Sequence, residues 1–492
     1  MITATNKGKY YDVEYSIVNV SELERELRID AEYYEPVYLY QIKKIISKNW
    51  MPLKKLLKEP ISNGFDYRYF EEVGTPYIRV GDIKDFVIYL ENAVRVNPIK
   101  KPKKILLEIG DILLTRKGTV GEVSIIYSEK LRNIIISSEI MKLRPNSSKI
   151  NPYYLMVFLK SYFGEIQISQ NIHGIAHVSI TQEALENLKI SIPSDTFQKF
   201  IEKLVLKAYE ERQKAEQFYK QAEEILLEEL GLKNWKPKTK KTKIGGQEFK
   251  EEENISIRTL SNVIKADRMD AEYWEPKYDE IEEMIKSFEY EKLCRLASNS
   301  YETFNPKTCD YFYYLEIANV DLVTGNYELK KLPCASAPSR AKKIVDEKDI
   351  LISTVRPNRN AVAFVIRKDK DPFVASTGFC KLKVMDERIL PEYLFVLFKT
   401  DLYRELLIRK TTATMYPAVS ENDIMQLDIP ILPMDIQEHI RDLVMIGFQS
   451  RENSKKLLEI AKKTVEIYIE KDEEEGLNYA RNKLNELNIE IK

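Results

Sequence analysis

The 492-residue sequence predicts an α+β protein with two pseudo-repeated mixed α/β units separated by two long antiparallel coiled-coil helices. Three observations predict this fold class: a duplication that keeps nearly one offset, runs of β-branched residues between turn signals in both copies, and a long helical stretch that closes each copy. The length is about three times that of a typical domain, which also favours more than one hydrophobic core.

The duplication is clearest in a nine-residue motif. The segment 28–36 reads RIDAEYYEP and recurs 240 residues later, at 268–276, as RMDAEYWEP. Segments 110–114 and 151–155 recur at 348–352 and 390–394, with offsets of 238 and 239. Because the offset hardly changes, the copies are two versions of one structural unit and not an array of short repeats.

Each copy is predicted to contain strands followed by a helix. Runs rich in Ile, Val, Leu and Tyr between turn residues indicate the strands, which are 76–83, 110–115, 121–127 and 134–143 in the first copy and 313–320, 350–355, 361–366 and 373–384 in the second. The helices that follow are expected at 153–163 and 392–407.

A long helix then closes each copy. Residues 197–230 contain no Gly or Pro, and steps of three and four predict a packed stripe of Ile201, Leu204, Ala208, Ala215, Phe218, Ala222 and Ile225. The matching stripe in the second copy is Ile440, Leu443, Gly447, Ser450, Ser454, Leu457, Ala461, Thr464 and Tyr468. Small residues in both stripes favour close antiparallel pairing of the two helices. The alternative is that each helix lies only on its own globular unit.

These patterns divide the chain into six segments. We expect globular units at 1–193 and 254–433, long helices at 194–232 and 434–471, a linker at 233–253, and a helical tail at 472–492. The linker begins with a basic run in which six lysines lie between positions 233 and 243.

Composition and motifs exclude several classes of function. The net charge is −1, and the sequence shows neither a membrane-spanning apolar run nor an apparent signal peptide, so we expect a cytoplasmic protein. The four cysteines have no metal-ligand spacing, and neither a metal site nor a disulfide framework is expected. The phosphate-binding, hydrolase, metalloprotease and amino-methyltransferase motifs are missing. His173 and His177 are better explained as exposed loop residues than as a metal pair.

Polar, aromatic and basic residues gather at turns between the predicted strands in both copies. Such side chains can contact phosphates and base edges of DNA, although most of them taken singly would be ordinary solvated loop residues. The candidate DNA-binding residues are Tyr67, Arg68, Tyr69, Arg79, Arg116, Lys117, Thr119, Asn171 and His173 in the first copy, and Tyr301, Asn305, Arg356, Asn358, Arg359, Asn360, Arg409, Lys410, Thr411 and Thr412 in the second.

The doubled motif, the strand 77–83, the segment 110–121 and the helix-terminated duplication together resemble the DNA specificity subunit of type I restriction-modification systems. The likeness runs from about residue 18 to residue 470. In the second copy it departs from the pattern, because Gly118-Thr119-Val120-Gly121 is replaced by Pro357-Asn358-Arg359-Asn360.

The resemblance implies a non-catalytic chain with two target-recognition domains, each of which reads one half of a bipartite site in double-stranded DNA. It also implies two modification (methyltransferase) subunits and restriction/translocase subunits as partners. No cofactor is expected on this chain, and S-adenosylmethionine is expected on the modification subunit. The alternatives are a free-standing DNA methyltransferase or nuclease, for which a cofactor or metal motif is missing, and a solitary specificity-like coiled-coil scaffold that is not engaged in restriction.

Overall fold

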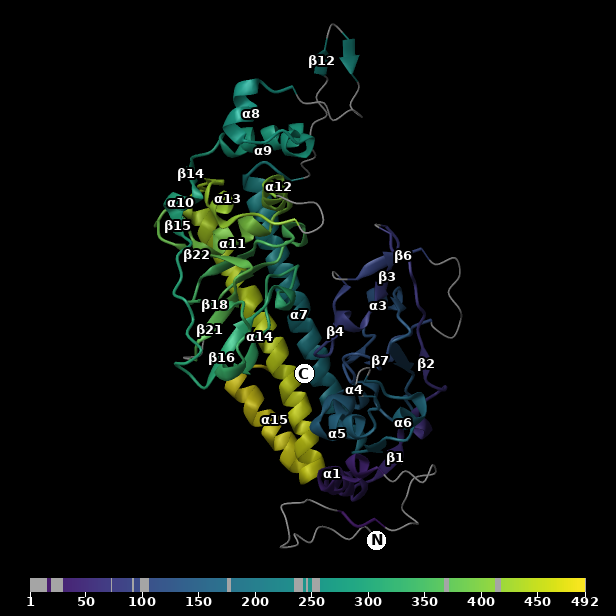
Figure 1. Cartoon of the computed structure of the whole chain (residues 1–492). Helices are drawn as coiled ribbons and strands as arrows, with labels where there is room; N and C mark the ends of the chain where they lie inside the picture. Colours follow the sequence, from purple (N-terminus) through teal and green to yellow (C-terminus); the bar gives the residue numbers. More distant parts are fainter. Residues whose placement is uncertain are drawn as a thin grey trace. The chain divides into compact units, whose positions relative to one another are not determined.

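A computed structural model describes residues 16–18, 30–71, 73–90, 93–97, 106–174, 178–233, 242–244, 247–249, 257–366, 371–411 and 417–491. The chain forms two compact units (Figure 1). Unit 1 comprises residues 1–212 and 452–492, and unit 2 comprises residues 213–451. The two long helices therefore each contribute one part to unit 1 and the other part to unit 2.

Unit 1 contains short helices, one four-stranded sheet, one three-stranded sheet and two two-stranded sheets. Its helical elements are η2 (Ala31–Tyr34), α1 (Pro36–Ile46), α2 (Leu53–Leu56), η3 (Val80–Asp82), α3 (Glu129–Arg132), α4 (Pro152–Lys160), α5 (Tyr162–Gln170), α6 (Gln182–Glu186), residues 195–212 of α7 (Asp195–Glu229), residues 452–470 of α14 (Met434–Glu470), and α15 (Glu473–Leu487). Its strands are β1 (Trp50–Pro52), β2 (Ser62–Asn63), β3 (Thr75–Ile78), β4 (Ile83–Lys84), β5 (Val87–Ile88), β6 (Val94–Val96), β7 (Ile112–Thr115), β8 (Val123–Ile125), β9 (Ile135–Ile136), β10 (Ile140–Leu143) and β11 (Lys189–Ser191).

Unit 2 repeats this order. Its helical elements are residues 213–229 of α7, α8 (Leu260–Ala266), η6 (Ala271–Trp274), α9 (Pro276–Ile285), α10 (Leu293–Leu296), η7 (Ile317–Asn319), η8 (Cys334–Ser336), η9 (Pro357–Arg359), α11 (Pro391–Lys399), α12 (Asp401–Arg409), α13 (Glu421–Met425), and residues 434–451 of α14. Its strands are β12 (Thr242–Ile244), β13 (Gln247–Phe249), β14 (Tyr290–Lys292), β15 (Ala297–Ser298), β16 (Tyr311–Leu315), β17 (Lys330–Pro333), β18 (Ala341–Ile344), β19 (Ile350–Ser353), β20 (Val362–Phe364), β21 (Phe373–Ser376), β22 (Phe379–Val384) and β23 (Asp428–Pro430).

The sheets of the two units have matching topology. The order β2-β10-β7-β8 in unit 1 corresponds to β15-β22-β19-β20 in unit 2, and both four-stranded sheets are antiparallel throughout. A second sheet has the order β6-β3-β9 in unit 1 and β17-β16-β21-β18 in unit 2, with one parallel pair in each. The predicted α+β class and the duplication are therefore confirmed at the level of strand pairing.

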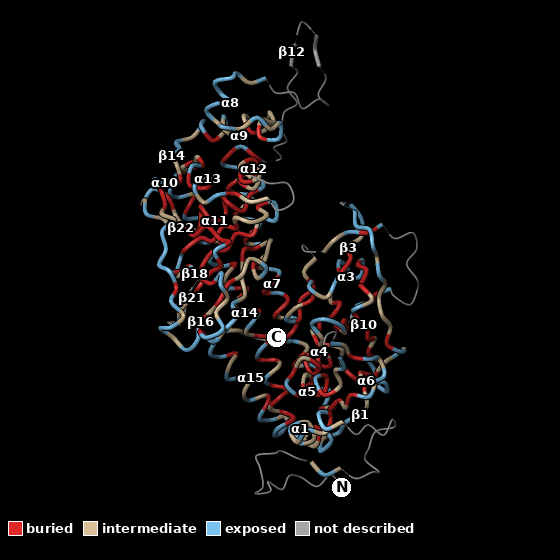
Figure 2. Tube along the Cα trace, viewed as in Figure 1, coloured by how far each residue is buried: buried red, intermediate tan, exposed pale blue. Residues whose placement is uncertain are grey.

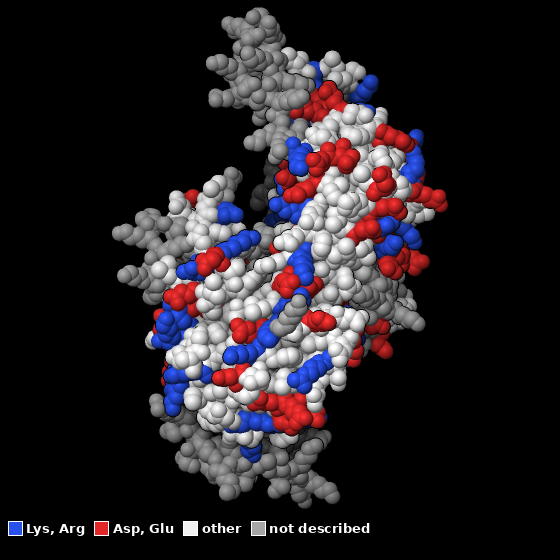
Figure 3. All heavy atoms as spheres, turned by 180° about the vertical axis from the view of Figure 1, so that it is seen from behind, with Lys and Arg blue, Asp and Glu red and all other residues white. Residues whose placement is uncertain are grey.

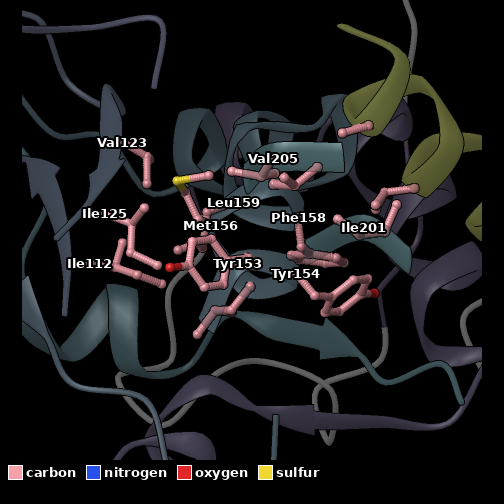
Figure 4. Packing of buried hydrophobic residues seen from close by; sticks show 14 of the residues in the cluster. Ile112, Val123, Ile125, Tyr153, Tyr154, Met156, Phe158, Leu159, Ile201 and Val205 are labelled. Atoms are coloured by element: carbon pink, nitrogen blue, oxygen red, sulfur yellow. The ribbon is translucent and has the colours of Figure 1, made fainter. Parts of the chain in front are cut away.

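Helix α4 lies at the centre of the larger core of unit 1. Its residues Tyr153 to Leu159 are all buried, and they pack against β7 and β8 on one side and against α7 on the other (Figure 4). Asn151 caps the helix by accepting hydrogen bonds from the backbone N–H groups of Tyr153 and Tyr154 at 2.9 and 3.2 Å. An apolar helix without a polar face is expected to be buried in this way. Figure 2 shows the same buried centre in both units.

A buried glutamine near the start of each long helix holds that helix to its own unit. Gln198 on α7 accepts from the N–H of Asn151 at 2.8 Å and donates to the carbonyl of Pro193 at 2.9 Å. Gln437 on α14 accepts from the N–H of Leu390 at 2.8 Å and donates to the carbonyl of Leu432 at 2.8 Å. The same contacts, 239 residues apart, show that the duplication extends into the long helices.

The long helices α7 and α14 run antiparallel within each unit. In unit 1 the ring centroids of Phe197, near the start of α7, and Tyr468, near the end of α14, are 5.1 Å apart. In unit 2 a Cβ added to Gly447 of α14 would lie 3.3 Å from the backbone oxygen of Ala215 of α7, so the glycine lets the two helices approach closely. The predicted pairing of the two long helices is confirmed, and α15 (Glu473–Leu487) follows α14.

The packed stripe on α7 differs from the prediction after position 215. Phe218 and Ile225 are only half-buried, whereas the adjacent Tyr219 and Leu226 are buried in the core of unit 2. The helix lies against the globular part of unit 2 as well as against α14, so its buried face is wider than a two-helix seam. Of the predicted linker 233–253, only residue 233 and the paired strands β12 and β13 are among the described residues.

Unit 2 contains a disulfide, which corrects the expectation from the sequence. Cys309 and Cys334 are bonded, with their Cα atoms 6.1 Å apart. Their spacing of 25 residues carries no signal by itself, but the antiparallel pairing of β16 with β17 places Tyr311 opposite Pro333 and so brings the neighbouring cysteines together. Cys294 and Cys380 are free.

Candidate nucleic-acid interface

The turn after β7 forms the centre of the candidate interface in unit 1. Gly118 and Gly121 have φ angles of +73° and +92°, which glycine adopts without strain. Thr115 closes the turn, because its hydroxyl donates to the carbonyl of Thr119 at 2.6 Å and accepts from the N–H of Glu122 at 2.9 Å. Lys117 and Thr119 consequently project from a fixed backbone and are exposed.

A second segment lies beside this turn. The N–H of Gly118 donates to the carbonyl of Val178 at 3.3 Å, and the N–H of Ile180 donates to the carbonyl of Arg116 at 3.1 Å. His173 and Ser179 exchange two backbone hydrogen bonds of 2.9 and 3.0 Å. Lys117 and His173 are distant in the sequence, and they therefore lie on opposite sides of Ser179. Asn171 lies nearby, but its side chain donates to the carbonyl of Gln167 at 2.9 Å.

The turn between β9 and β10 connects these residues to the aromatic segment before β3. The N–H of Arg116 donates to the carbonyl of Glu139 at 2.8 Å, and the hydroxyl of Ser138 donates to Asp66 at 2.5 Å. The segment 65–69 and the turn 116–119 thus lie on either side of residues 137–139. In this segment Tyr67 is half-buried, whereas Arg68 and Tyr69 are exposed.

Arg79 leaves the end of β3 and is exposed, with its Nε atom 3.7 Å from the carboxylate of Asp82. Burial raises the pKa of Asp82, while the N–H and the guanidinium of Arg79 act in the opposite direction. Burial likewise raises the pKa of Tyr77, whose hydroxyl donates to the carbonyl of Phe65 at 2.8 Å. These groups stiffen the base of the interface and leave the guanidinium of Arg79 partly accessible.

Unit 2 has the same backbone hydrogen bonds at the corresponding turn. The N–H of Arg356 donates to the carbonyl of Pro417 at 2.7 Å, and the N–H of Val419 donates to the carbonyl of Thr354 at 2.9 Å. These bonds align Gly118 with Arg356, and not with Pro357 as the sequence comparison suggested. Arg356 and Asn360, with φ of +51° and +56°, take the places of Gly118 and Gly121, and the turn between them is one residue longer.

The longer turn contains η9 and presents Asn358 and Arg359 to solvent. Asn360 does not point outward in the same way, because its side-chain amide donates to the carbonyl of Lys399 at 2.5 Å. Its Oδ1 atom is buried and has no hydrogen-bond partner among the described residues, and the same is true of the Nε atom of Arg116 in unit 1. Each turn therefore keeps one unpaired buried polar atom near its base.

Buried lysines support both turns, and the sequence analysis did not identify them. Lys160 at the end of α4 pairs with Glu122 at 3.0 Å and with Glu165 at 3.2 Å. Its counterpart Lys399 at the end of α11 donates to the carbonyl of Leu322 at 2.8 Å. Burial alone would lower both pKa values; the carboxylates reverse this for Lys160, whereas the pKa of Lys399 falls to about 8. Lys160 and Lys399 are 239 residues apart, which is the offset of the duplication, and this correspondence could have identified them from the sequence.

The other predicted residues of unit 2 have mixed surroundings. Tyr301 is exposed at the edge of its ring, and the Nζ atom of Lys343 lies 4.4 Å from the ring centroid. Asn305 is exposed and forms a tight turn, in which its side-chain oxygen accepts from the N–H of Lys307 at 3.1 Å. Lys410 and Thr411 are half-buried at the end of α12, and Thr412 lies outside the described residues.

Arg409 serves packing inside unit 2. It is 6% exposed, its Nε atom donates to the carbonyl of Tyr273 at 3.0 Å, and its Nη1 atom donates to Glu282 at 2.5 Å. In unit 1 the corresponding Gln170 is also buried and donates to the carbonyl of Tyr33 at 2.8 Å. Each of these side chains thus donates to a tyrosine carbonyl of the doubled nine-residue motif and fixes that motif within its own unit. We therefore leave Arg409 out of the interface.

Charge does not gather on one broad face in the view of Figure 3, where Lys and Arg are interspersed with Asp and Glu. No group of three or more potential metal ligands was found among the described residues. In the same part of the chain, no helix is both long enough and apolar enough to span a bilayer.

Comparison with solved structures finds S subunits of type I systems. The S subunit from M. genitalium aligns over 86% of this chain and 95% of its own, with 13% identity and a TM-score of 0.37. The HsdS subunit from Thermoanaerobacter tengcongensis aligns over 86% of this chain and 97% of its own, with 14% identity and a TM-score of 0.28.

Sequence comparison finds the same class of protein. A chain of Methanocaldococcus jannaschii assigned as the type I restriction enzyme MjaX specificity subunit is 33% identical over 170 residues, 32% of this chain and 39% of that one. The HindI specificity subunit of Haemophilus influenzae is 30% identical over 110 residues, 22% of this chain and 24% of that one. The matched regions thus span well under half of these relatives.

A family model adds the most direct match. The model of the type I restriction modification DNA specificity domain matches residues 33–222, which include the globular part of unit 1 and most of α7. The duplicated topology of unit 2 repeats the fold of this matched region. Residues 33–222 of the chain are therefore similar to the type I restriction modification DNA specificity domain.

Proposed function

We propose that this chain is the non-catalytic DNA-binding specificity subunit of a type I restriction-modification complex. Each globular segment, 1–193 and 254–433, reads one half of a bipartite site in double-stranded DNA. The helices 194–232 and 434–471 connect them and carry surfaces for two modification subunits. Those subunits supply S-adenosylmethionine and the methyltransferase active site, and restriction subunits join the same complex.

The observation that carries the proposal is the recurrence of one hydrogen-bonded turn with different exposed side chains. The turn is anchored by the same backbone contacts in both units, through Ile180 in unit 1 and Val419 in unit 2. It presents Lys117 and Thr119 in unit 1 but Asn358 and Arg359 in unit 2. A common frame with different hydrogen-bonding groups at its tip is what reading two different half-sites requires.

The chemistry of these groups fits direct readout of DNA. An arginine or lysine can donate to the O6 and N7 atoms of guanine, and an asparagine can form two hydrogen bonds with adenine. His173, placed beside Lys117 through Ser179, and Arg79 at the end of β3 add donors to the interface of unit 1. The similarity to the DNA specificity domain supports DNA as the ligand, and the two turns support one half-site per unit.

The proposal is tested by single substitutions in the reconstituted complex. The chain is assembled with its modification subunits, and all methylated sites on genomic DNA are mapped. Arg359→Ala should relax sequence preference in one half-site and weaken binding to it by about 1–3 kcal/mol, and Lys117→Ala should affect only the other half-site. Lys55→Gln, an exposed position on α2 beside β1, is the matched control and should leave both half-sites unchanged.

Two results would contradict the proposal. One is methyl transfer by the purified chain alone with S-adenosylmethionine, because a specificity subunit has no catalytic centre. The other is a complex in which neither substitution alters the mapped sites although the complex assembles and methylates normally.

A further inference from the structure

A loop just before β3 in unit 1 exposes large apolar side chains. Tyr69 is 87% exposed, Val73 is 82% exposed and Phe70 is 48% exposed. Scattered apolar residues on a surface need no explanation, but a group at the tip of one loop marks a binding surface. The loop lies in the candidate interface, since Arg68 and the half-buried Tyr67 precede it directly.

The base of this loop is fixed by packing. The ring of Tyr77, buried on β3, is 5.4 Å from the ring of Tyr67 and 6.1 Å from the ring of Phe70, measured between centroids. The N–H of Glu71 donates to the carbonyl of Arg95 at 2.9 Å, and the guanidinium of Arg95 donates to the carbonyl of Gly74 at 2.9 Å. Tyr69 and Val73 thus extend into solvent from a loop that is held at several points.

The charges around the loop suit a nucleic-acid backbone. Arg68 and Arg95 are exposed on its two sides, and the carboxylate of Asp66 is engaged by the hydroxyl of Ser138. Glu71 is the remaining exposed carboxylate among the described residues of the loop. A carboxylate at this place can accept a hydrogen bond from the amino group of cytosine, whereas the arginines can contact phosphates.

Unit 2 keeps the corresponding aromatic side chain inside. Between β15 and β16, Phe304 is only 4% exposed, and its ring centroid lies 4.7 Å from that of Phe312. The N–H of Phe304 donates to the carbonyl of Lys342 at 2.8 Å, so this segment is paired along β18. Phe304 of unit 2 is thus packed, whereas Tyr69 and Val73 of unit 1 extend into solvent.

We propose that Tyr69 and Val73, supported by Phe70, insert as a wedge between stacked base pairs beside the half-site that unit 1 reads. Aromatic and aliphatic side chains that enter a base step unstack it and kink the duplex. Flexible pyrimidine–purine steps accept such a wedge at the lowest cost, so the wedge would also select for the step at its position. This inference rests on the proposed function, because it assigns a deformation of DNA to the same interface.

The test places a fluorescent adenine analogue in the recognised duplex. The complex of this chain with its modification subunits is bound to a duplex carrying the mapped site, with 2-aminopurine at successive positions around the unit 1 half-site except the methylated base. The wild-type complex should raise the fluorescence at one base step. Tyr69→Ser with Val73→Ser should abolish that rise and weaken binding about tenfold, whereas Tyr69→Phe should keep it.

Two controls separate this role from folding and from affinity. Tyr290→Ser, which removes an exposed tyrosine of unit 2 outside the candidate interface, should leave the fluorescence rise intact. Arg68→Gln should weaken binding at all sites and reduce its salt dependence without moving the fluorescence signal, because it removes a phosphate contact. The thermal midpoint of the double variant should equal that of Tyr69→Phe, since both side chains are exposed.

The wedge is overturned if the wild-type complex binds its site with no rise at any position, or if the double variant shows the same rise. A wild-type complex that shows no preference for any DNA sequence would instead refute the proposed function, and the wedge with it.

Discussion

Arg409 lies inside unit 2 with its guanidinium carbon 4.6 Å from the ring centroid of Tyr273 and 5.0 Å from that of Tyr278. In the sequence it belongs to the run Arg409-Lys410-Thr411-Thr412, whose side chains are candidate DNA-binding residues. The residue is instead the last of α12, and its hydrogen bonds hold η6 and α9 in place. The burial of Arg409 and its ion-pair partner could not be predicted from the sequence, because both depend on α9, which lies more than a hundred residues earlier in the chain.

Replacing Arg409 with alanine should lower the free energy of unfolding of unit 2 by about 2 kcal/mol, because the carbonyl of the buried Tyr273 loses its donor and the half-buried Glu282 loses its ion-pair partner. Arg409→Gln, which copies Gln170 of unit 1, should recover part of this loss by bonding the carbonyl of Tyr273. Urea unfolding measures both values. A change of recognised bases in the Arg409→Gln complex would show that the residue contacts DNA after all.

The positions of Gly118 and Gly121 show that a sequence comparison does not reveal the backbone conformation of a turn. Gly118 and Gly121 in unit 1 have positive φ, so their replacement by larger residues in unit 2 looked like the loss of the turn. The structure shows that Arg356 and Asn360 adopt the same left-handed region, with one additional residue between them. Asparagine tolerates this region better than other non-glycine residues, but an arginine there could not be foreseen from propensity.

At the scale of elements, the strands and long helices follow closely from the sequence. The predicted helices 194–232 and 434–471 correspond to α7 at Asp195–Glu229 and α14 at Met434–Glu470. The stretch of α7 contains neither Gly nor Pro, which makes this helix easy to predict. The face that α7 buries was predicted less well, because Tyr219 and Leu226 contact the globular part of unit 2 and periodicity alone does not show that neighbour.

The disulfide is an element-scale feature with a testable consequence. It closes a loop of 25 residues that contains both β16 and β17, next to the segment that carries Tyr301 and Asn305. In the chain-entropy model a crosslink of this length stabilises by about 3 kcal/mol.

Reduction, or the substitution Cys309→Ser with Cys334→Ser, should therefore lower the thermal midpoint of unit 2 by several degrees and leave unit 1 unchanged. Differential scanning calorimetry with and without a reductant measures this. Cys294→Ser is the matched control, since Cys294 is free and exposed. Equal loss of stability in unit 1 would contradict a local role for the crosslink.

At the scale of the whole molecule, the duplication is the feature that the sequence predicts most surely. Matching offsets in the doubled motif and in Gln198 and Gln437 correspond to identical contacts in the two units. The features in which the two copies differ could not be predicted from the sequence. They are the turn of Arg356–Asn360, the disulfide, and the exposed loop of Tyr69. Differences of this kind are expected where two copies of one fold have different targets.

The central claim is that each unit reads its own half of one DNA site, and an exchange of one unit tests it most directly. Residues 254–433 are replaced by the corresponding segment of a relative with a different recognition site, and the exchanged chain is assembled with the modification subunits. Methylated positions are then mapped on genomic DNA by sequencing. Our account predicts that one half-site changes to that of the relative while the other half-site stays the same. A change in both halves, or an unchanged site in an active complex, would contradict it.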